Sequence, residues 1–161
     1  MKRITAAIAA LTLALSLCAC SKPADNDHTP DMQAVADAVG ASIDISEMSQ
    51  IPDEYVAGLM GIAPTSYVIR NTLISAVGTN IDEYGIFQCE TEDKADELED
   101  ILEDYLDYRE SVWMDEYLPD EKPKLDDAEV WTEGCFVMYA ILDDADRDAV
   151  EKAFTGCFTE G

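Results

Sequence analysis

AEVWTEGCFVMYAIL, residues 128–142, decides the fold of this chain. Residues 128–132 alternate in polarity, which is typical of a half-buried strand. Glu133-Gly134 predicts a turn, and residues 135–142 are a continuous apolar run that predicts a second strand. The segment therefore predicts two strands joined by a tight turn.

Two further strands are predicted before this segment. Residues 66–74 contain Tyr67-Val68-Ile69 and Thr72-Leu73-Ile74, which are rich in the β-branched and aromatic residues that strands prefer. Gly78-Thr79-Asn80 ends this strand. Residues 83–89, EYGIFQC, predict the next one.

The longest predicted helix lies between these two pairs of strands. Thr91 is a suitable N-cap, and the acids that follow it favour the positive end of a helix dipole. An apolar stripe follows helical spacing at Ala95, Leu98, Ile101, Leu102, Tyr105, Tyr108 and Val112. Acidic residues cover the remaining circumference: Glu97, Glu99, Asp100, Glu103, Asp104 and Asp107.

Three shorter helices complete the pattern. One begins near Met32 and is closed by Gly40, and a second is opened by Pro52 and ends before Gly61. The last begins after Asp143 or Asp144 and buries Ala149, Val150, Ala153 and Phe154. Between the long helix and residue 128, Pro119 and Pro123 bracket a predicted loop.

These elements predict an α+β fold. Two N-terminal helices precede a β-β-α-β-β-α series, and we expect a four-stranded antiparallel sheet with helices packed on one face. The order of the strands within the sheet stays open.

The N-terminus predicts export and lipid anchoring. Lys2 and Arg3 precede an apolar run, residues 4–17, that is too short to span a bilayer. Leu17-Cys18-Ala19-Cys20 resembles the lipobox of bacterial lipoproteins, which implies that Cys20 carries a diacylglycerol group in the membrane. We expect residues 1–19 to be a signal peptide, 20–30 a lipidated cysteine and linker, and 31–161 one domain. An ordinary cleaved signal is the alternative.

Charge narrows the classes of partner. The chain has 10 Lys and Arg against 35 Asp and Glu, a formal net charge of −25. Nucleic acid is disfavoured, because its phosphates must be neutralised by bases, and so is adsorption on an anionic lipid surface. A cationic partner or divalent cations are allowed, although solubility is a simpler reason for such acidity.

Few residues offer chemistry. The only histidine, His28, lies in the linker, so catalysis by a Ser/His or Cys/His arrangement is disfavoured, and no Gly-rich phosphate loop implies a cofactor. No pair stands out among the 35 acids. Asp144-Ala145-Asp146-Arg147-Asp148 is similar to the start of a calcium loop, but an acidic first helical turn explains it better.

Cysteines and aromatic residues supply the remaining candidates. Cys89 and Cys135, at the ends of predicted strands, either form a disulfide or are buried thiols. No zinc-ligand spacing occurs. Trp113, Met114 and Tyr117 form either an interaction patch or outer core. Arg70 and Arg109 are expected to form ion pairs.

From Val56 onward, about two-thirds of the chain resembles a family of bacterial lipoproteins catalogued as domain of unknown function 4358. The resemblance is carried by Gly61-Ile62-Ala63-Pro64, Asp82-Glu83-Tyr84-Gly85-Ile86-Phe87, Tyr108-Arg109, Tyr117-Leu118-Pro119 and Glu133-Gly134-Cys135-Phe136-Val137. It implies a small, secreted, lipid-anchored domain and brings no assigned activity.

The leading functional hypothesis is therefore a non-enzymatic interaction module, anchored through Cys20 at the outer face of a bacterial membrane and bound to another envelope component. Capture of a cation or small ligand by the acidic surface is the first alternative. An enzyme of the cell wall that works with carboxylates alone is the second.

Overall fold

A computed structural model describes residues 29–114 and 116–159 of the chain. One antiparallel sheet contains five strands in the order β1-β2-β3-β5-β4. The strands are β1 Met48–Gln50, β2 Ile69–Ser75, β3 Glu83–Gln88, β4 Glu129–Glu133 and β5 Phe136–Ile141. The helices are α1 Met32–Gly40, α2 Asp53–Gly58, α3 Glu92–Ser111, α4 Lys122–Asp126 and α5 Asp144–Gly156.

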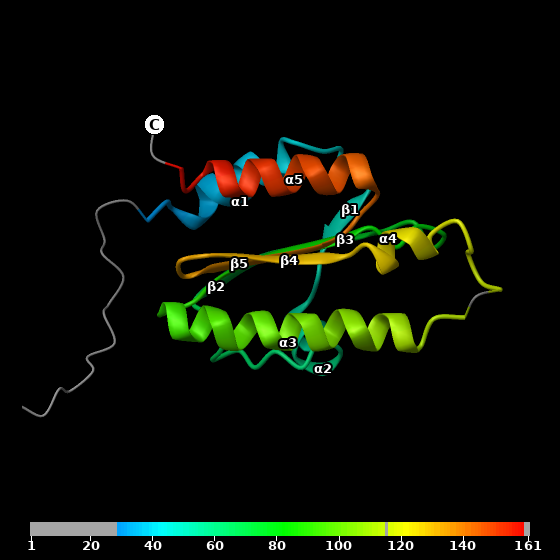
Figure 1. The fold of residues 1–161 in the computed structure, drawn as a ribbon, viewed down its shortest axis with the longest axis horizontal. Helices are drawn as coiled ribbons and strands as arrows, with labels where there is room; N and C mark the ends of the chain where they lie inside the picture. Colours follow the sequence, from blue (N-terminus) through cyan, green and yellow to red (C-terminus); the bar gives the residue numbers. More distant parts are fainter. Residues whose placement is uncertain (1–28, 115, 160–161) are drawn as a thin grey trace, which may run out of the picture.

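The α+β class is confirmed, but the expected layering is wrong. Helices cover both faces of the sheet, not one: Figure 1 shows α1 and α5 on one side of the sheet and α2 and α3 on the other. The reason lies in the central strands, because every residue of β5 is buried and only Gln88 of β3 is not. A strand that is apolar on both faces must be covered on both.

The sheet has five strands and not the expected four. β1 lies between the two N-terminal helices and pairs with β2, with Met48 opposite Ser75 and Gln50 opposite Leu73. Its three residues, Met-Ser-Gln, are too few for an alternating pattern and include no β-branched residue. The predicted loop between Pro119 and Pro123 also contains an unpredicted short helix, α4, with Pro123 in its first turn.

Each face has its own core. On the α1/α5 face, Val35, Val39, Val150 and Phe154 pack on alternate residues of the sheet such as Met138. On the α3 face the sheet contributes Phe87, Val137 and Tyr139, and the helices contribute Val56, Ala95, Leu98, Leu102 and Tyr105. The predicted apolar stripe of α3 is thus confirmed as far as Tyr105, but Tyr108 and Val112 are about half exposed, at 50% and 53%.

The two long helices begin where the sequence predicts. Thr91 caps α3 by accepting a hydrogen bond from the backbone N–H of Lys94. Asp143 caps α5 by accepting from the N–H groups of Ala145 and Asp146. These caps fix the ends of the two helices that flank strand β4 (Figure 1).

Candidate functional site

Strand β4 is a free edge of the sheet. It is joined to β5 by a two-residue turn, in which Gly134 takes a φ of 58° that suits the first central position of a type II′ turn. β5 pairs with one side of β4, and within residues 29–114 and 116–159 no strand pairs with its other side.

The hydrogen bonds of β5 show which groups of β4 point outward. The N–H of Cys89 donates to the carbonyl of Cys135 over 2.7 Å, so Cys135 faces β3. Backbone direction alternates along an antiparallel strand, and Phe136 and Met138 therefore face β4. Their partners on β4, Glu133 and Trp131, direct their backbone groups toward β5. The N–H and C=O groups of Val130 and Thr132 are therefore directed to the free edge.

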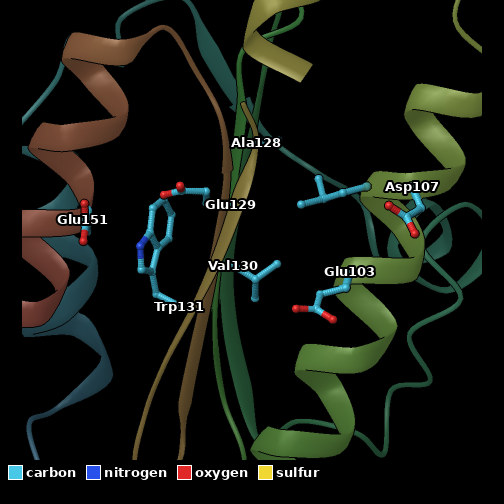
Figure 2. A pocket seen from close by; sticks show the side chains of 8 residues that line it. Glu103, Asp107, Ala128, Glu129, Val130, Trp131 and Glu151 are labelled. Atoms are coloured by element: carbon cyan, nitrogen blue, oxygen red, sulfur yellow. The ribbon is translucent and has the colours of Figure 1, made fainter. Parts of the chain in front are cut away.

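A groove of about 660 Å³ runs along this edge. We call it the β4 groove; it is lined by Glu103, Leu106, Asp107, Ala128, Glu129, Val130, Trp131 and Glu151. Figure 2 shows β4 between the two helices, with Glu103 and Asp107 on α3 and Glu151 on α5. Side chains of the strand alternate, so that Val130 lies on the α3 side and Glu129 and Trp131 lie on the α5 side.

Four carboxylates surround the β4 groove: Glu103, Asp107, Glu129 and Glu151. Within the part of the chain that the structure describes, none of them forms an ion pair or a side-chain hydrogen bond. Glu103 and Asp107 are four residues apart on α3, where like charges destabilise a helix by a few tenths of a kcal/mol. The β4 groove thus combines four apolar side chains with negative charge on both sides of the strand.

The most buried carboxylate lies elsewhere, on the α3 face of the sheet. Glu83 is fully buried and accepts hydrogen bonds from Tyr105 Oη at 2.8 Å and from Tyr139 Oη at 2.6 Å. Arg109 donates to its other oxygen at 2.8 Å and to Tyr105 Oη at 2.6 Å. We call these four residues the Glu83 cluster.

The pKa values in the Glu83 cluster favour a neutral tyrosine pair beside a charged arginine. Burial, reinforced by the charge of Glu83, holds the pKa of both Tyr105 and Tyr139 well above the ordinary value for tyrosine. The pKa of Arg109 is also raised, because its interactions with Tyr105 and Glu83 outweigh its own desolvation. The cluster is internally satisfied, because its four side chains bond to one another.

Sequence reasoning anticipated single members of this cluster but not the cluster. Arg109 was expected to form an ion pair, and it does so with Glu83, 26 residues away. Arg70 likewise pairs with Asp53. The signal for the cluster was an acid within an apolar strand, together with Tyr105 and Arg109 one helical turn apart.

The two cysteines singled out from the sequence lie directly opposite each other, beyond the last paired residues of β3 and β5. Both are free thiols in the structure and both are buried. Burial raises the pKa of Cys89 to about 11, and the nearby Cys135 adds to the rise. A disulfide between Cys89 and Cys135 stays a prediction.

The expected interaction patch follows the C-terminal end of α3. Met114 and Tyr117 are exposed, at 64% and 55%, whereas Trp113 is half-buried. None of the three lines the β4 groove. From the sequence, Glu103 and Asp107 were placed on a helix face and residues 128–131 in a strand. Leu106 and Glu151 were not singled out, and nothing in the sequence placed β4 at an edge.

Two predictions concern metals and the membrane. The calcium-like run begins α5 as expected, with Asp144 paired to Arg147. In residues 29–114 and 116–159, no group of three or more His, Cys, Asp or Glu is placed to hold a metal ion. No helix in those ranges combines the length and apolarity needed to cross a bilayer. Cys20 lies outside the described residues.

Comparison with known proteins identifies a family for this chain. No curated protein and no solved structure matches the chain. Residues 41–142 match the family described as Domain of unknown function (DUF4358). This match covers all five strands, α2, α3 and α4, and it ends before α5. The chain therefore belongs to the DUF4358 family.

Proposed function

We propose that this chain is a lipid-anchored, non-enzymatic interaction module at the outer face of a bacterial membrane, and that it binds an envelope partner along β4. The observation that carries the proposal is the β4 groove, where Val130 and Thr132 direct backbone groups to a free edge between unpaired carboxylates. The lipobox-like residues 17–20 support the anchor. Membership of a family without assigned activity supports no particular chemistry.

The surroundings of the buried acid Glu83 favour an interaction module over a carboxylate-dependent enzyme. Glu83 is the one carboxylate among the described residues with a fully buried side chain. It is held by Tyr105, Tyr139 and Arg109 inside the core, where a substrate from solvent has no access. A general acid or base must instead lie within hydrogen-bond reach of its substrate.

Site-specific crosslinking in intact cells tests the binding surface. A photo-crosslinking amino acid replaces Ala128, which lines the β4 groove, in the full-length lipidated protein. The matched control replaces Ala34, an exposed alanine of α1. We expect one discrete protein adduct from position 128 and none from position 34. Equal adducts from both positions, or none from position 128 in a well-expressed protein, contradict the proposal.

The anchor is tested separately with Cys20→Ala. We expect this variant to be released from the membrane or to accumulate with its signal uncleaved, because two acyl chains hold a protein durably where the polypeptide alone does not. Membrane fractionation and the mobility of the protein on a gel measure both outcomes. Retention equal to that of the unchanged protein contradicts lipidation at Cys20.

Capture of a divalent cation is the second candidate function, and the formal net charge of −25 favours it. Calcium should then raise the melting temperature more than monovalent salt at the same ionic strength, because a ligand that binds only the folded state stabilises it. Equal shifts with the two salts remove this candidate. The proposed interaction module predicts equal shifts.

A further inference from the structure

We infer that the occupant of the β4 groove is an extended cationic segment of a partner protein, which adds to the sheet as a sixth strand. This inference rests on the proposed function and names the class of partner. It starts from the backbone: a strand edge presents unpaired N–H and C=O groups that template another strand. On β4 these groups belong to Val130 and Thr132.

Strand addition fits the walls of the groove. An added strand lies about 4.8 Å from β4 and sends its successive side chains to opposite faces of the sheet. One set would meet Glu103 and Asp107 on α3, and the other would meet Glu129 and Glu151 (Figure 2). A run of consecutive bases can therefore pair with carboxylates on both sides, whereas bases at every second position can use one side only.

The floor of the β4 groove suits the stems of basic side chains. Leu106 and Val130 offer apolar surface on the α3 side, and Trp131 offers an aromatic ring on the α5 side. Arginine and lysine lay their methylene stems on apolar surface while the charged head reaches an acid, and arginine also stacks on tryptophan. An acidic segment would be repelled on both sides, which fixes the sign of the partner's charge.

The opposite edge of the sheet lacks these features. β1 has three residues, whereas β4 has five. Very short edge strands are one way in which proteins block strand addition. The inference is therefore specific to β4.

The probe is an eight-residue synthetic peptide with blocked ends, in which four consecutive arginines are flanked by threonine and valine. The matched peptide carries N-methyl groups on alternate residues, on the edge that would face β4; it keeps every charge and loses the backbone donors. Calorimetric titration at physiological salt compares the two on the whole mature chain. We expect the methylated peptide to bind about tenfold or more weakly, since each lost hydrogen bond costs about 1 kcal/mol.

Two variants of the chain locate the site. Val130→Pro removes an outward N–H and no bond to β5, since proline is accepted on an edge strand whose N–H faces solvent. The quadruple variant Glu103→Gln, Asp107→Asn, Glu129→Gln and Glu151→Gln keeps the shapes and removes the charges. Both should keep the melting transition of the unchanged chain and bind the arginine peptide at least about tenfold more weakly.

Amide hydrogen exchange gives a readout that needs no variant. The amides of Val130 and Thr132 should exchange quickly in the free chain and slowly with the arginine peptide bound. Those of Trp131 and Glu133 point to β5 and should be slow in both states, which makes them an internal control.

The outcomes separate this inference from the proposed function. If the methylated peptide binds as tightly as the arginine peptide, or if protection appears away from Val130 and Thr132, strand addition is overturned. A discrete adduct from position 128 in cells would then still support the interaction module. If neither the adduct nor peptide binding is found, both are overturned.

Discussion

The two faces of the sheet are closed in different ways. On the α1/α5 face the contacts are apolar, with Phe154 and Val150 of α5 packed on residues such as Met138. On the α3 face a similar apolar core also contains the Glu83 cluster, in which Tyr105 and Arg109 reach the same carboxylate. Apolar burial has no preferred direction, whereas two hydrogen bonds from successive turns of α3 to one carboxylate are directional and fix the helix along the sheet. The α1/α5 layer is therefore held by buried apolar area, and the α3 layer is held in addition by directional hydrogen bonds.

The largest expected effect comes from breaking the directional layer. Arg109→Met removes the charge that compensates buried Glu83, and the loss of one partner of a buried ion pair costs about 3–5 kcal/mol. Its matched control on the other layer is Arg147→Met, which removes a pair with an exposed carboxylate, that of Asp144, worth about 0–1 kcal/mol. Urea unfolding measures both. Equal losses would show that the two layers are held alike.

The second prediction concerns alkaline pH. In the reduced protein, burial raises the pKa of Cys89 from 9 to about 11. As the pH rises, the unfolded chain loses this proton first, so stability is full below pH 9 and falls between pH 9 and 11. The shift of two units corresponds to about 2–3 kcal/mol. The slope of unfolding free energy against pH should therefore flatten in Cys89→Ala within that window.

Tyr84, on the α1/α5 face, gives the matched alkaline measurement for the other layer. Burial raises its pKa from 10 to about 12. The same sign applies, so its contribution is complete below pH 10 and is lost between pH 10 and 12. Tyr84→Phe should flatten the slope in this higher window and leave the lower one unchanged. If the slope of unfolding free energy against pH flattened in Tyr84→Phe below pH 10, a group other than Tyr84 would be responsible.

The third prediction tests the close packing beneath Tyr139. A Cβ added at Gly85 would lie 2.5 Å from Cε1 of Tyr139 and 2.6 Å from Cγ2 of Thr72. Gly85→Ala must therefore displace the ring that donates to Glu83, and we expect a loss of about 1–3 kcal/mol. Gly156→Ala, at the end of α5, meets open space and should change stability by no more than about 1 kcal/mol. Thermal unfolding of the two variants measures the difference.

The smallest expected effect compares the caps of the two long helices. Thr91→Ala and Asp143→Ala each remove a side-chain acceptor for the first turn and should each cost about 1 kcal/mol. α3 is also held by the Glu83 cluster, and α5 is not. Fraying of the first turn, measured by amide exchange, should therefore spread further along α5 than along α3. Equal spread would weaken the contrast between the layers.

Much of the fold could be predicted because its signals are local. The caps at Thr91 and Asp143, the turn at Gly134 and the apolar period of α3 each occupy a few neighbouring residues. β1 could not be predicted, since it is a strand only through its pairing with β2. The apolar run of 135–142 did contain the signal for helices on both faces, because a strand with one wet face alternates and this one does not.

The candidate site was harder to predict, since it depends on strand order. The hairpin of β4 and β5 is local, but the pairing of β5 with β3 joins residues about fifty positions apart and is what leaves β4 at the edge. Glu103 and Glu129 look like ordinary solvated acids until that order is known. The Glu83 cluster was hidden for the same reason, because Tyr139 reaches Glu83 across two paired strands.

The contact between Gly85 and Tyr139 has a consequence for the history of the family. The ring occupies the space that any side chain at position 85 would need, and its hydroxyl group satisfies Glu83. Relatives should therefore inherit positions 85 and 139 as a pair, with a larger residue at 85 only where 139 has become smaller. Where that exchange has occurred, we expect the acid at position 83 to have been replaced as well. Positions 83, 85 and 139 should therefore change together among relatives.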